Sequence, residues 1–381
     1  MSKFILTASK VFGLGHYGGK TSRKATLILK KTFAVVAVNS IVAVLLFLLI
    51  EGLSAIIYAT KYVFWDSSSV AERRHTKYDE ELGWVNLPNI YIKDMYGPGK
   101  FFRTNSQSFR NDNDFSRSVP YGKVRFICSG DSFTMGYGVD NENTWCELLG
   151  SINGRIESIN MGHGGYGVDQ AYLWYKRNSA QFDHDVHIFA FISGDFGRMA
   201  SDIFLGYGKP LLELRNGHLV NTDRPVPKAA YYFQLPQVQN AIKNLSSVRL
   251  LTAIFSRVGA FSAFERENKK TNQQIQEVAL KIFQDLQRIN QAKKSTLVLV
   301  LLPGEVDYMT KYSEYWREFL YRETAKNGWL FIDLIEEFRN YPPQEVGTLF
   351  NVHYSEKGNA YIAEILYKKL LAIPEISRKF S

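Results

Sequence analysis

A serine stands where an apolar run of the chain ends. Residues 124–128 are rich in β-forming side chains, and Gly130-Asp131-Ser132 comes directly after them. In open α/β sheets, chemistry gathers at the carboxyl ends of the strands. A neutral serine is a weak nucleophile and needs a nearby base. His353 is the candidate base, because an imidazole with a pKa near 6.5 can accept a proton at neutral pH. The pair would perform acyl transfer.

The pattern of the main part of the chain predicts an α/β fold. Apolar runs typical of buried strands alternate with segments of helical periodicity, which predicts a parallel sheet covered on both faces, a three-layer α/β/α sandwich over residues 121–376. The predicted strands are 124–128, 156–161, 186–192, 296–302 and 329–332. The predicted helices lie around 145–152 and over 168–180, 271–289, 315–327 and 356–371. This topology would bring Ser132 and His353 to one edge of the sheet.

Two other segments surround or interrupt this alternation. Residues 60–120 are polar and aromatic, with several turn signals, and are expected to form lead-in strands and loops. Residues 200–265 are expected to form an inserted lobe near the strand ends. Within this lobe, Asn216-Gly217 joins two short, partly apolar runs, 211–215 and 218–220, and this predicts a hairpin.

The net charge of +9 is concentrated at the N-terminus. Residues 1–31 contain seven Lys and Arg residues and no acid, so they carry +7 and the other 350 residues carry +2. A nearly neutral body is not the footprint of a nucleic-acid-binding protein. The basic tail precedes residues 32–50, which contain no charge, and the apolar character continues to residue 59.

Residues 32–59 are predicted to form a transmembrane signal anchor. About 19 uncharged residues at about 1.5 Å each span a hydrocarbon core of about 30 Å. The basic excess before them predicts a cytoplasmic tail at 1–31 and a periplasmic or extracellular body. A buried core helix would be shorter and less uniformly apolar, and a cleaved signal peptide would carry a small-residue cleavage site.

The two cysteines, Cys128 and Cys146, do not make a disulfide framework. Cys128 lies within the first apolar run and is expected to be a small buried hydrophobic residue. So few thiols are compatible with an oxidising exterior.

Three blocks of sequence resemble the SGNH/GDSL esterase family, in its membrane-anchored bacterial form. The blocks are Gly-Asp-Ser-Phe-Thr at 130–134 with Gly-Tyr-Gly-Val at 136–139, Asn-Met-Gly-His-Gly-Gly-Tyr-Gly at 160–167, and His-Tyr-Ser-Glu-Lys-Gly at 353–358. The lead-in Asn-Ser-Gln-Ser-Phe-Arg at 105–110 is also similar to that of membrane-anchored members. The resemblance covers residues 80–375 and implies a Ser132 nucleophile, a His353 base, and backbone N–H groups of Ser132 and Gly165 as oxyanion donors.

The chain departs from the family pattern at two places. Between the second and the last of these blocks, the family usually has a further block with an oxyanion asparagine. Gly194 stands at that position here and is followed by Asp195. The family also usually has an aspartate two or three residues before the histidine, where Asn351 and Phe350 stand. An asparagine could orient the imidazole but would not stabilise an imidazolium by charge. The site is therefore a Ser–His pair, a triad completed by Asn351 or by a residue such as Glu345, or a site without activity.

Other interpretations of these residues are weaker. Ser132 could be only a helix N-cap, and His353 a cap or a surface residue. The glycines at 162–167 also fit a dinucleotide-binding spacing, but they come after the second strand of the unit, and those at 13–18 come after no strand. Residues 183–187 (Asp-His-Asp-Val-His) lack a matching metal-ligand cluster. We therefore expect no cofactor and no metal.

The sequence thus predicts a membrane-anchored serine esterase or O-acyltransferase acting on ester-linked acyl groups of an envelope or exported polysaccharide. The alternative is a degenerate SGNH-fold protein that binds glycan or supports polysaccharide assembly without turnover. The acyl group, the glycan and the oligomeric state are left open by the sequence.

Overall fold

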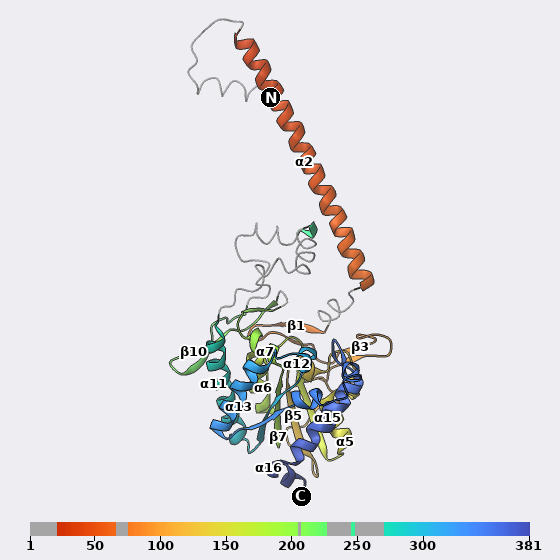
Figure 1. The fold of residues 1–381 in the computed structure, drawn as a ribbon, viewed down its shortest axis with the longest axis vertical. Helices are drawn as coiled ribbons and strands as arrows, with labels where there is room; N and C mark the ends of the chain where they lie inside the picture. Colours follow the sequence, from red (N-terminus) through yellow and green to blue (C-terminus); the bar gives the residue numbers. More distant parts are fainter. Residues whose placement is uncertain (1–20, 66–74, 205–206, 227–244, 248–269) are drawn as a thin grey trace. The chain divides into compact units, whose positions relative to one another are not determined.

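The computed structural model describes residues 21–65, 75–204, 207–226, 245–247 and 270–381 (Figure 1). The chain forms two compact units, residues 1–65 with 241–261, and residues 66–240 with 262–381. Of the segments discussed above, residues 1–20, with the glycines at 13–18, and most of the expected lobe beyond residue 226 lie outside the described residues.

The larger unit is built on a five-stranded parallel sheet. Its strands are β5 (Val124–Gly130), β6 (Ile156–Gly162), β7 (Val186–Phe191), β12 (Thr296–Leu301) and β13 (Leu330–Asp333). Their order across the sheet is β13-β12-β7-β5-β6, and every neighbouring pair is parallel. The chain therefore reverses its direction of travel across the sheet beside β5, and in such sheets ligands bind at this switch point.

Two hydrophobic clusters cover the two faces of the sheet. Alternate residues of each strand point into opposite clusters, so Phe126 and Ile188 lie in one and Ile127 and Phe189 in the other. The first cluster, which contains Phe126 and Ile188, also includes side chains of α5 (Trp145–Ile152) and α15 (Glu356–Leu371). The second cluster, which contains Ile127 and Phe189, includes side chains of α6 (Val168–Asn178), α11 (Asn272–Ala292) and α13 (Glu314–Asn327). The predicted three-layer sandwich is confirmed.

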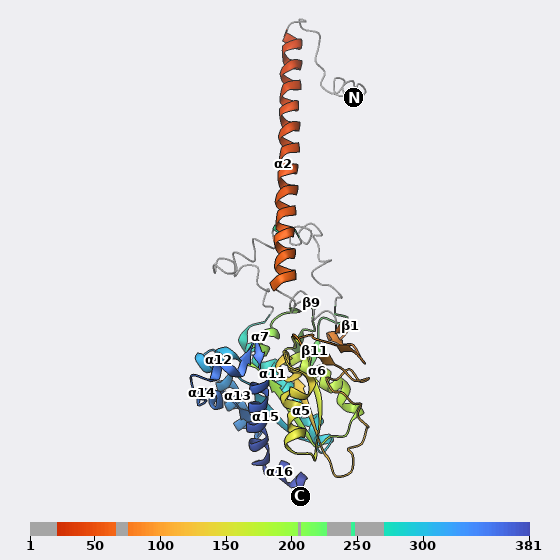
Figure 2. The ribbon, with the colours of Figure 1, turned by 90° about the vertical axis from the view of Figure 1, so that its right-hand side faces the viewer.

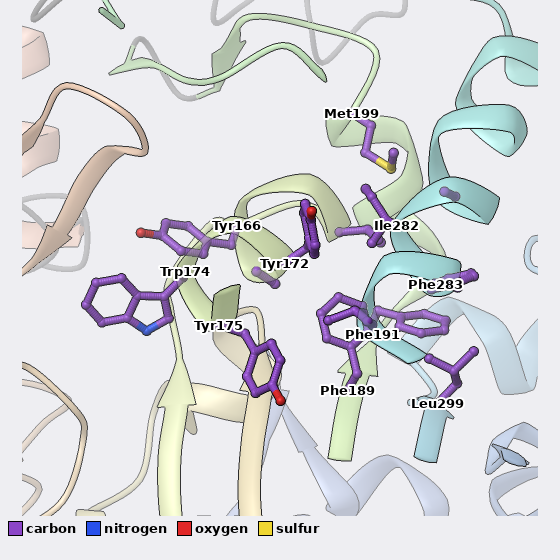
Figure 3. Packing of buried hydrophobic residues seen from close by; sticks show 14 of the residues in the cluster. Tyr166, Tyr172, Trp174, Tyr175, Phe189, Phe191, Met199, Ile282, Phe283 and Leu299 are labelled. Carbon is purple, nitrogen blue, oxygen red and sulfur yellow. The ribbon is translucent and has the colours of Figure 1, made fainter. Parts of the chain in front are cut away.

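The helices of each outer layer pack against one another as well as against the sheet. Helices α5 and α15 are in contact on one face, and α6 and α11 on the other (Figures 1 and 2). Figure 3 shows how aromatic side chains fill the second cluster, where Phe189 and Phe191 of β7 lie beside Phe283 of α11. Because the strands are buried on both faces, their sequences are continuous apolar runs.

The lead-in segment contributes to the same core. Strands β1 (Thr76–Asp79) and β2 (Gly83–Asn86) form a hairpin, and β3 (Tyr91–Ile92) pairs with β4 (Phe102–Arg103). Leu82, Trp84 and Phe109 are buried in the second cluster. Residues 75–120 are thus part of the sandwich unit.

The described part of the lobe contains two more hairpins. Strands β8 (Ile203–Phe204) and β9 (Tyr207–Gly208) form the first, and β10 (Leu212–Arg215) and β11 (His218–Asn221) form the second. The turn of the second is Asn216-Gly217, both with positive φ (51° and 77°), as its sequence predicts.

The smaller unit contains the helix α2 (Thr21–Trp65). Within it, residues Ile28–Ile57 have a mean hydropathy of 2.9 and are long and apolar enough to cross a membrane. Glu51 is the one acid within residues 32–59. Its carboxylate accepts hydrogen bonds from the backbone N–H (3.0 Å) and hydroxyl (2.6 Å) of Ser247.

The cysteines differ from the sequence-based expectation. Cys128 of β5 and Cys146 of α5 are joined in a disulfide, with their Cα atoms 6.2 Å apart. Cys128 is buried as expected, but it is not a free thiol. The pairing depends on the packing of α5 on the sheet, where it contacts β6 beside β5, and residue spacing alone does not specify this packing.

Candidate active site

Ser132 lies at the switch point of the sheet, in the first position of a short helix. Helix α4 (Ser132–Met135) begins directly after β5 and Asp131. The carboxylate of Asp131 accepts the backbone N–H of Phe133 (2.9 Å), so Asp131 is the N-cap of this helix. The capping role proposed as an alternative for Ser132 is therefore performed by its neighbour, and the Ser132 hydroxyl is available for another partner.

That partner is His353. The Oγ atom of Ser132 lies 2.7 Å from Nε2 of His353, across 221 residues of sequence. His353 belongs to a two-residue strand, β15 (His353–Tyr354), which pairs with β14 (Phe350–Asn351) through a turn at Val352 with φ of 65°. The buried Tyr354 hydroxyl donates to the carbonyl of Pro303 (2.6 Å) and anchors the strand beside the sheet.

Two aromatic rings enclose the imidazole. The ring centroids of Phe133 and Tyr137 lie 4.5 Å and 4.7 Å from that of His353. Burial lowers the pKa of His353 to about 4, while the charge of Asp131 acts to raise it and that of Arg198 to lower it further. The imidazole is therefore neutral at physiological pH and can accept the proton of Ser132.

Within the described part of the chain, no third member of a triad contacts the other nitrogen of the imidazole. The Nδ1 atom of His353 is buried and, among the described residues, has no hydrogen-bond partner. Asn351 is exposed and sits opposite His353 in the hairpin, so it does not orient the ring as the sequence suggested. Glu345 also lies elsewhere, because its carboxylate pairs with Lys357 (2.9 Å). The structure corrects both expectations and leaves a Ser–His pair.

A charged cluster adjoins this pair, and no motif in the sequence predicts it directly. Arg198 forms ion pairs with Asp131 (3.2 Å) and Asp195 (2.5 Å), and it also donates to the carbonyl of Tyr166 (2.7 Å). Both carboxylates are nearly fully buried. Burial, and then the neighbouring charge of Asp131, raise the pKa of Asp195 well above its usual range. Arg198 therefore links the loop after β6, helix α7 (Ser193–Arg198) and the residue that precedes the serine.

The glycine-rich loop after β6 packs against the serine helix. A Cβ on Gly162 would lie 2.2 Å from the backbone nitrogen of Met135, so only glycine permits this close approach of β6 and α4. Gly165 has φ of 76°, and a Cβ there would meet the ring of Phe204 at 2.9 Å. These packing requirements account for the glycine spacing that also fits a dinucleotide site.

The remaining predicted oxyanion residue, Gly194, lies in the first turn of α7, directly after β7. A Cβ there would have only ordinary contacts with the Ile192 side chain. Beside it, the Ser193 hydroxyl is buried and has no hydrogen-bond partner within the described part of the chain. The start of α7 therefore has a glycine, Gly194, and a buried hydroxyl, that of Ser193, at the place where the family usually has an asparagine.

A second Ser–His pair lies inside the core. The Oγ atom of Ser129 is 2.6 Å from Nε2 of His187, and Nδ1 of His187 faces the side-chain nitrogen of Asn290 at 3.1 Å. Ser129 and His187 are both fully buried, and His184 contacts Tyr175 (2.9 Å) in the same network. These histidines, considered above as metal ligands, are held by neutral polar partners. Among the described residues, no three His, Cys, Asp or Glu side chains form a metal-binding cluster.

The similarities found to known proteins are to solved structures, at 11–16% sequence identity. No family model matches this chain, and no curated protein matches it. Solved structures do match. One is a putative lipolytic protein of the G-D-S-L family from Desulfitobacterium hafniense DCB-2, which is 14% identical over 65% of this chain and 99% of that chain, with a TM-score of 0.35.

Two other matching structures are esterases. The acetyl xylan esterase AlAXEase is 14% identical over 65% of this chain and 100% of that chain, with a TM-score of 0.38. The psychrotrophic esterase EstA from Pseudoalteromonas sp. is 12% identical over 66% of this chain and 100% of that chain, with a TM-score of 0.37.

Proposed function

We propose that this chain is a membrane-anchored serine esterase or O-acyltransferase of the SGNH/GDSL type. The observation that carries the proposal is the 2.7 Å contact between Ser132 Oγ and His353 Nε2 at the switch point of the sheet. Of the two Ser–His pairs described above, only this one has its serine beyond the end of β5 and includes a partly exposed histidine, whereas Ser129 lies within the strand. The Ser129 pair is sealed in the core, where no substrate enters.

The proposed reaction proceeds through an acyl-enzyme. Ser132 Oγ forms a bond to the carbonyl carbon of the ester while its proton passes to Nε2 of His353. The C–O bond to the alcohol then breaks, and His353 returns the proton to the alcohol oxygen. Water or a second hydroxyl next attacks the acyl carbon and gives its proton to His353; the bond from Ser132 Oγ to the acyl carbon breaks, His353 returns the proton to Oγ, and the carboxylic acid or the new ester leaves. Backbone N–H groups of Ser132 and Gly165 are the proposed donors to the oxyanion.

The missing third residue shapes this mechanism. His353 becomes an imidazolium during the reaction, with no hydrogen-bond acceptor at Nδ1 among the described residues. The acid that most favours its charged form is Asp131, next to the nucleophile. We propose that Asp131 supplies through space part of the charge stabilisation that a triad carboxylate supplies by contact.

The substrate and the location are part of the same proposal. A helix able to cross a membrane and a basic tail before it support anchoring with the N-terminus in the cytoplasm. The Cys128–Cys146 disulfide supports a sandwich unit in an oxidising compartment. Esters present there include acyl groups on envelope or exported polysaccharides, which we propose as the substrate class. A periplasmic reporter fused after Ser381 should be active, and activity of a cytoplasmic reporter instead would reverse the orientation.

A second function is favoured by two observations. Nδ1 of His353 has no hydrogen-bond partner among the described residues, and a glycine stands at position 194; both depart from the catalytic pattern of the family and support a site that binds a glycan without turnover. A fluorophosphonate probe separates the two functions, because it reacts only with an activated serine. We expect labelling of the wild type and of Ser129→Ala, and no labelling of Ser132→Ala or His353→Ala. An unlabelled wild-type protein that retains glycan binding would favour the non-enzymatic function.

A further inference from the structure

A small open hollow with a volume of about 40 Å³, well below that of a typical small-molecule site, lies beside the glycine-rich loop. Its wall combines aromatic rings, a thioether and glycine backbone, together with two polar residues of the lead-in segment. The residues that form the main wall are Trp84, Met135, Gly164, Gly165, Phe204 and Tyr207. They come from the lead-in, the serine helix, the loop after β6 and the inserted lobe.

We infer that this hollow receives the acyl side of the ester and limits it to a short chain, an inference that rests on the function proposed above. The carbonyl carbon under attack bears the acyl chain, the oxyanion and the leaving alcohol. The alcohol oxygen must face Nε2 of His353, which returns its proton. In the proposed mechanism the oxyanion faces the amide of Gly165, and Gly165 itself lines the hollow.

The rings around His353 are different from those of the hollow. Phe133 and Tyr137 contact the imidazole, and neither lines the hollow. The leaving alcohol, and with it any glycan, therefore belongs on the side of Phe133 and Tyr137. The acyl chain belongs on the side of Gly165, where the mainly apolar wall suits an alkyl group better than a polyhydroxylated ring.

The hollow is closed on one side by a fixed wall. The indole N–H of Trp84 donates to the carbonyl of Gly164 (2.9 Å), and the backbone carbonyl of Trp84 accepts the hydroxyl of Tyr166 (2.6 Å). Trp84 is 7% exposed, and its ring would lie 3.4 Å from a Cβ on Gly165. These contacts hold the indole over the loop and restrict the depth available to a chain.

Phe204 forms the second wall and is the better residue to change. Its ring lies closest to the Cβ position of Gly165, at 2.9 Å, and the guanidinium of Arg198 lies 4.9 Å above its centroid. It is only partly buried, so its truncation removes the wall with less effect on the core than a change at Trp84. Phe101 offers a matched control, because it is also partly buried and lies under an arginine, Arg103, at 5.6 Å.

The test measures kcat/KM for p-nitrophenyl acetate, butyrate and hexanoate. Wild type should prefer acetate. Each further methylene that enters an apolar site is worth about fourfold in kcat/KM. Phe204→Ala should therefore raise the hexanoate-to-acetate ratio at least about tenfold, and Phe204→Leu should raise it less. Phe204→Trp should lower the butyrate-to-acetate ratio, and Phe101→Ala should leave both ratios at the wild-type values.

The outcomes separate this inference from the proposed function. If ester hydrolysis depends on Ser132 but the ratios are the same in wild type and in Phe204→Ala, Phe204→Leu and Phe204→Trp, the acyl-side assignment is overturned and the esterase stands. If the wild type already prefers hexanoate, the limit to short chains is wrong. If wild type hydrolyses none of the three esters and reacts with no fluorophosphonate, the esterase function fails, and the assignment fails with it.

Discussion

The acid limb of the pH–rate profile should lie near pH 4, well below that of an ordinary histidine. His353 must be neutral to accept the proton of Ser132, and burial lowers its pKa from 6.5 to about 4. At pH 5, about 90% of a group with that pKa is neutral, against about 3% of a group with a pKa of 6.5. The structure therefore predicts about 30-fold more activity at pH 5 than an exposed imidazole would support.

The perturbation that tests the cause is Tyr137→Ser. The Tyr137 ring lies 4.7 Å from the imidazole and is one of the two rings that exclude water from it. Its removal should hydrate His353 and move the acid limb upward, toward pH 6.5. The ratio of kcat/KM at pH 5 to that at pH 8 should fall in this variant. Using the ratio removes effects of the substitution that do not depend on pH. Tyr121→Ser, at a fully exposed tyrosine, should keep the wild-type ratio.

The assay is release of p-nitrophenol from p-nitrophenyl acetate, with samples brought to alkaline pH before reading. Active-site concentration is taken from titration with a fluorophosphonate. A wild-type acid limb at pH 6.5 would refute the reasoning, because it would show that the imidazole is hydrated in solution. An acid limb near pH 4 that Tyr137→Ser does not move would refute the role assigned to that ring.

Three further substitutions and one pH effect test other parts of the structure. Arg110→Met should lower the free energy of unfolding by about 3 kcal/mol or more in urea titrations, because the buried guanidinium donates to three backbone carbonyls of the loop after Ser132. Gly162→Ala should reduce kcat/KM at least tenfold, since its Cβ would lie 2.2 Å from the α4 backbone, whereas Gly154→Ala has open space and should behave as wild type. Asn351→Ala should change kcat by less than about threefold, since no triad bond is lost; a loss like that of a triad carboxylate, of about 10⁴, would contradict this. Stability should fall as pH decreases from 6.5 to about 4, because the unfolded chain binds protons there that buried His184 and His353, each with its pKa lowered to about 4 by burial, do not; each contributes a loss on the order of 3 kcal/mol in calorimetry or urea titration, and a flat profile would contradict it.

The strands of the parallel sheet, though not their order, could be predicted because they are buried on both faces. Such strands are continuous apolar runs, and the five predicted runs correspond to the five strands of the sheet. Helix α11 extends over Asn272–Ala292 with Thr271 as its N-cap, close to the predicted 271–289, because its apolar stripe and its capping residue are both local signals.

The pairing of Ser132 with His353 could also be expected, but its surroundings could not. Both residues lie in short blocks whose position at strand ends is readable from the chain. Arg198 and Phe204 carry no such local signal, and they reach the site only because α7 and β8 fold back over the loop after β6. Asn351 shows the converse, since a plausible spacing in sequence leads to an exposed side chain when the hairpin turns at Val352.

The sequence by itself determined the elements and the two reacting groups, because apolar periodicity, glycine turns and short blocks act over distances of a few residues. Tertiary structure alone decided what surrounds those groups. It joined Cys128 to Cys146, left Nδ1 of His353 without a partner among the described residues, and closed a hollow beside Gly165 with rings from two distant segments. Each of these depends on the distance between atoms on different elements, which is set by the packing of helices on the sheet.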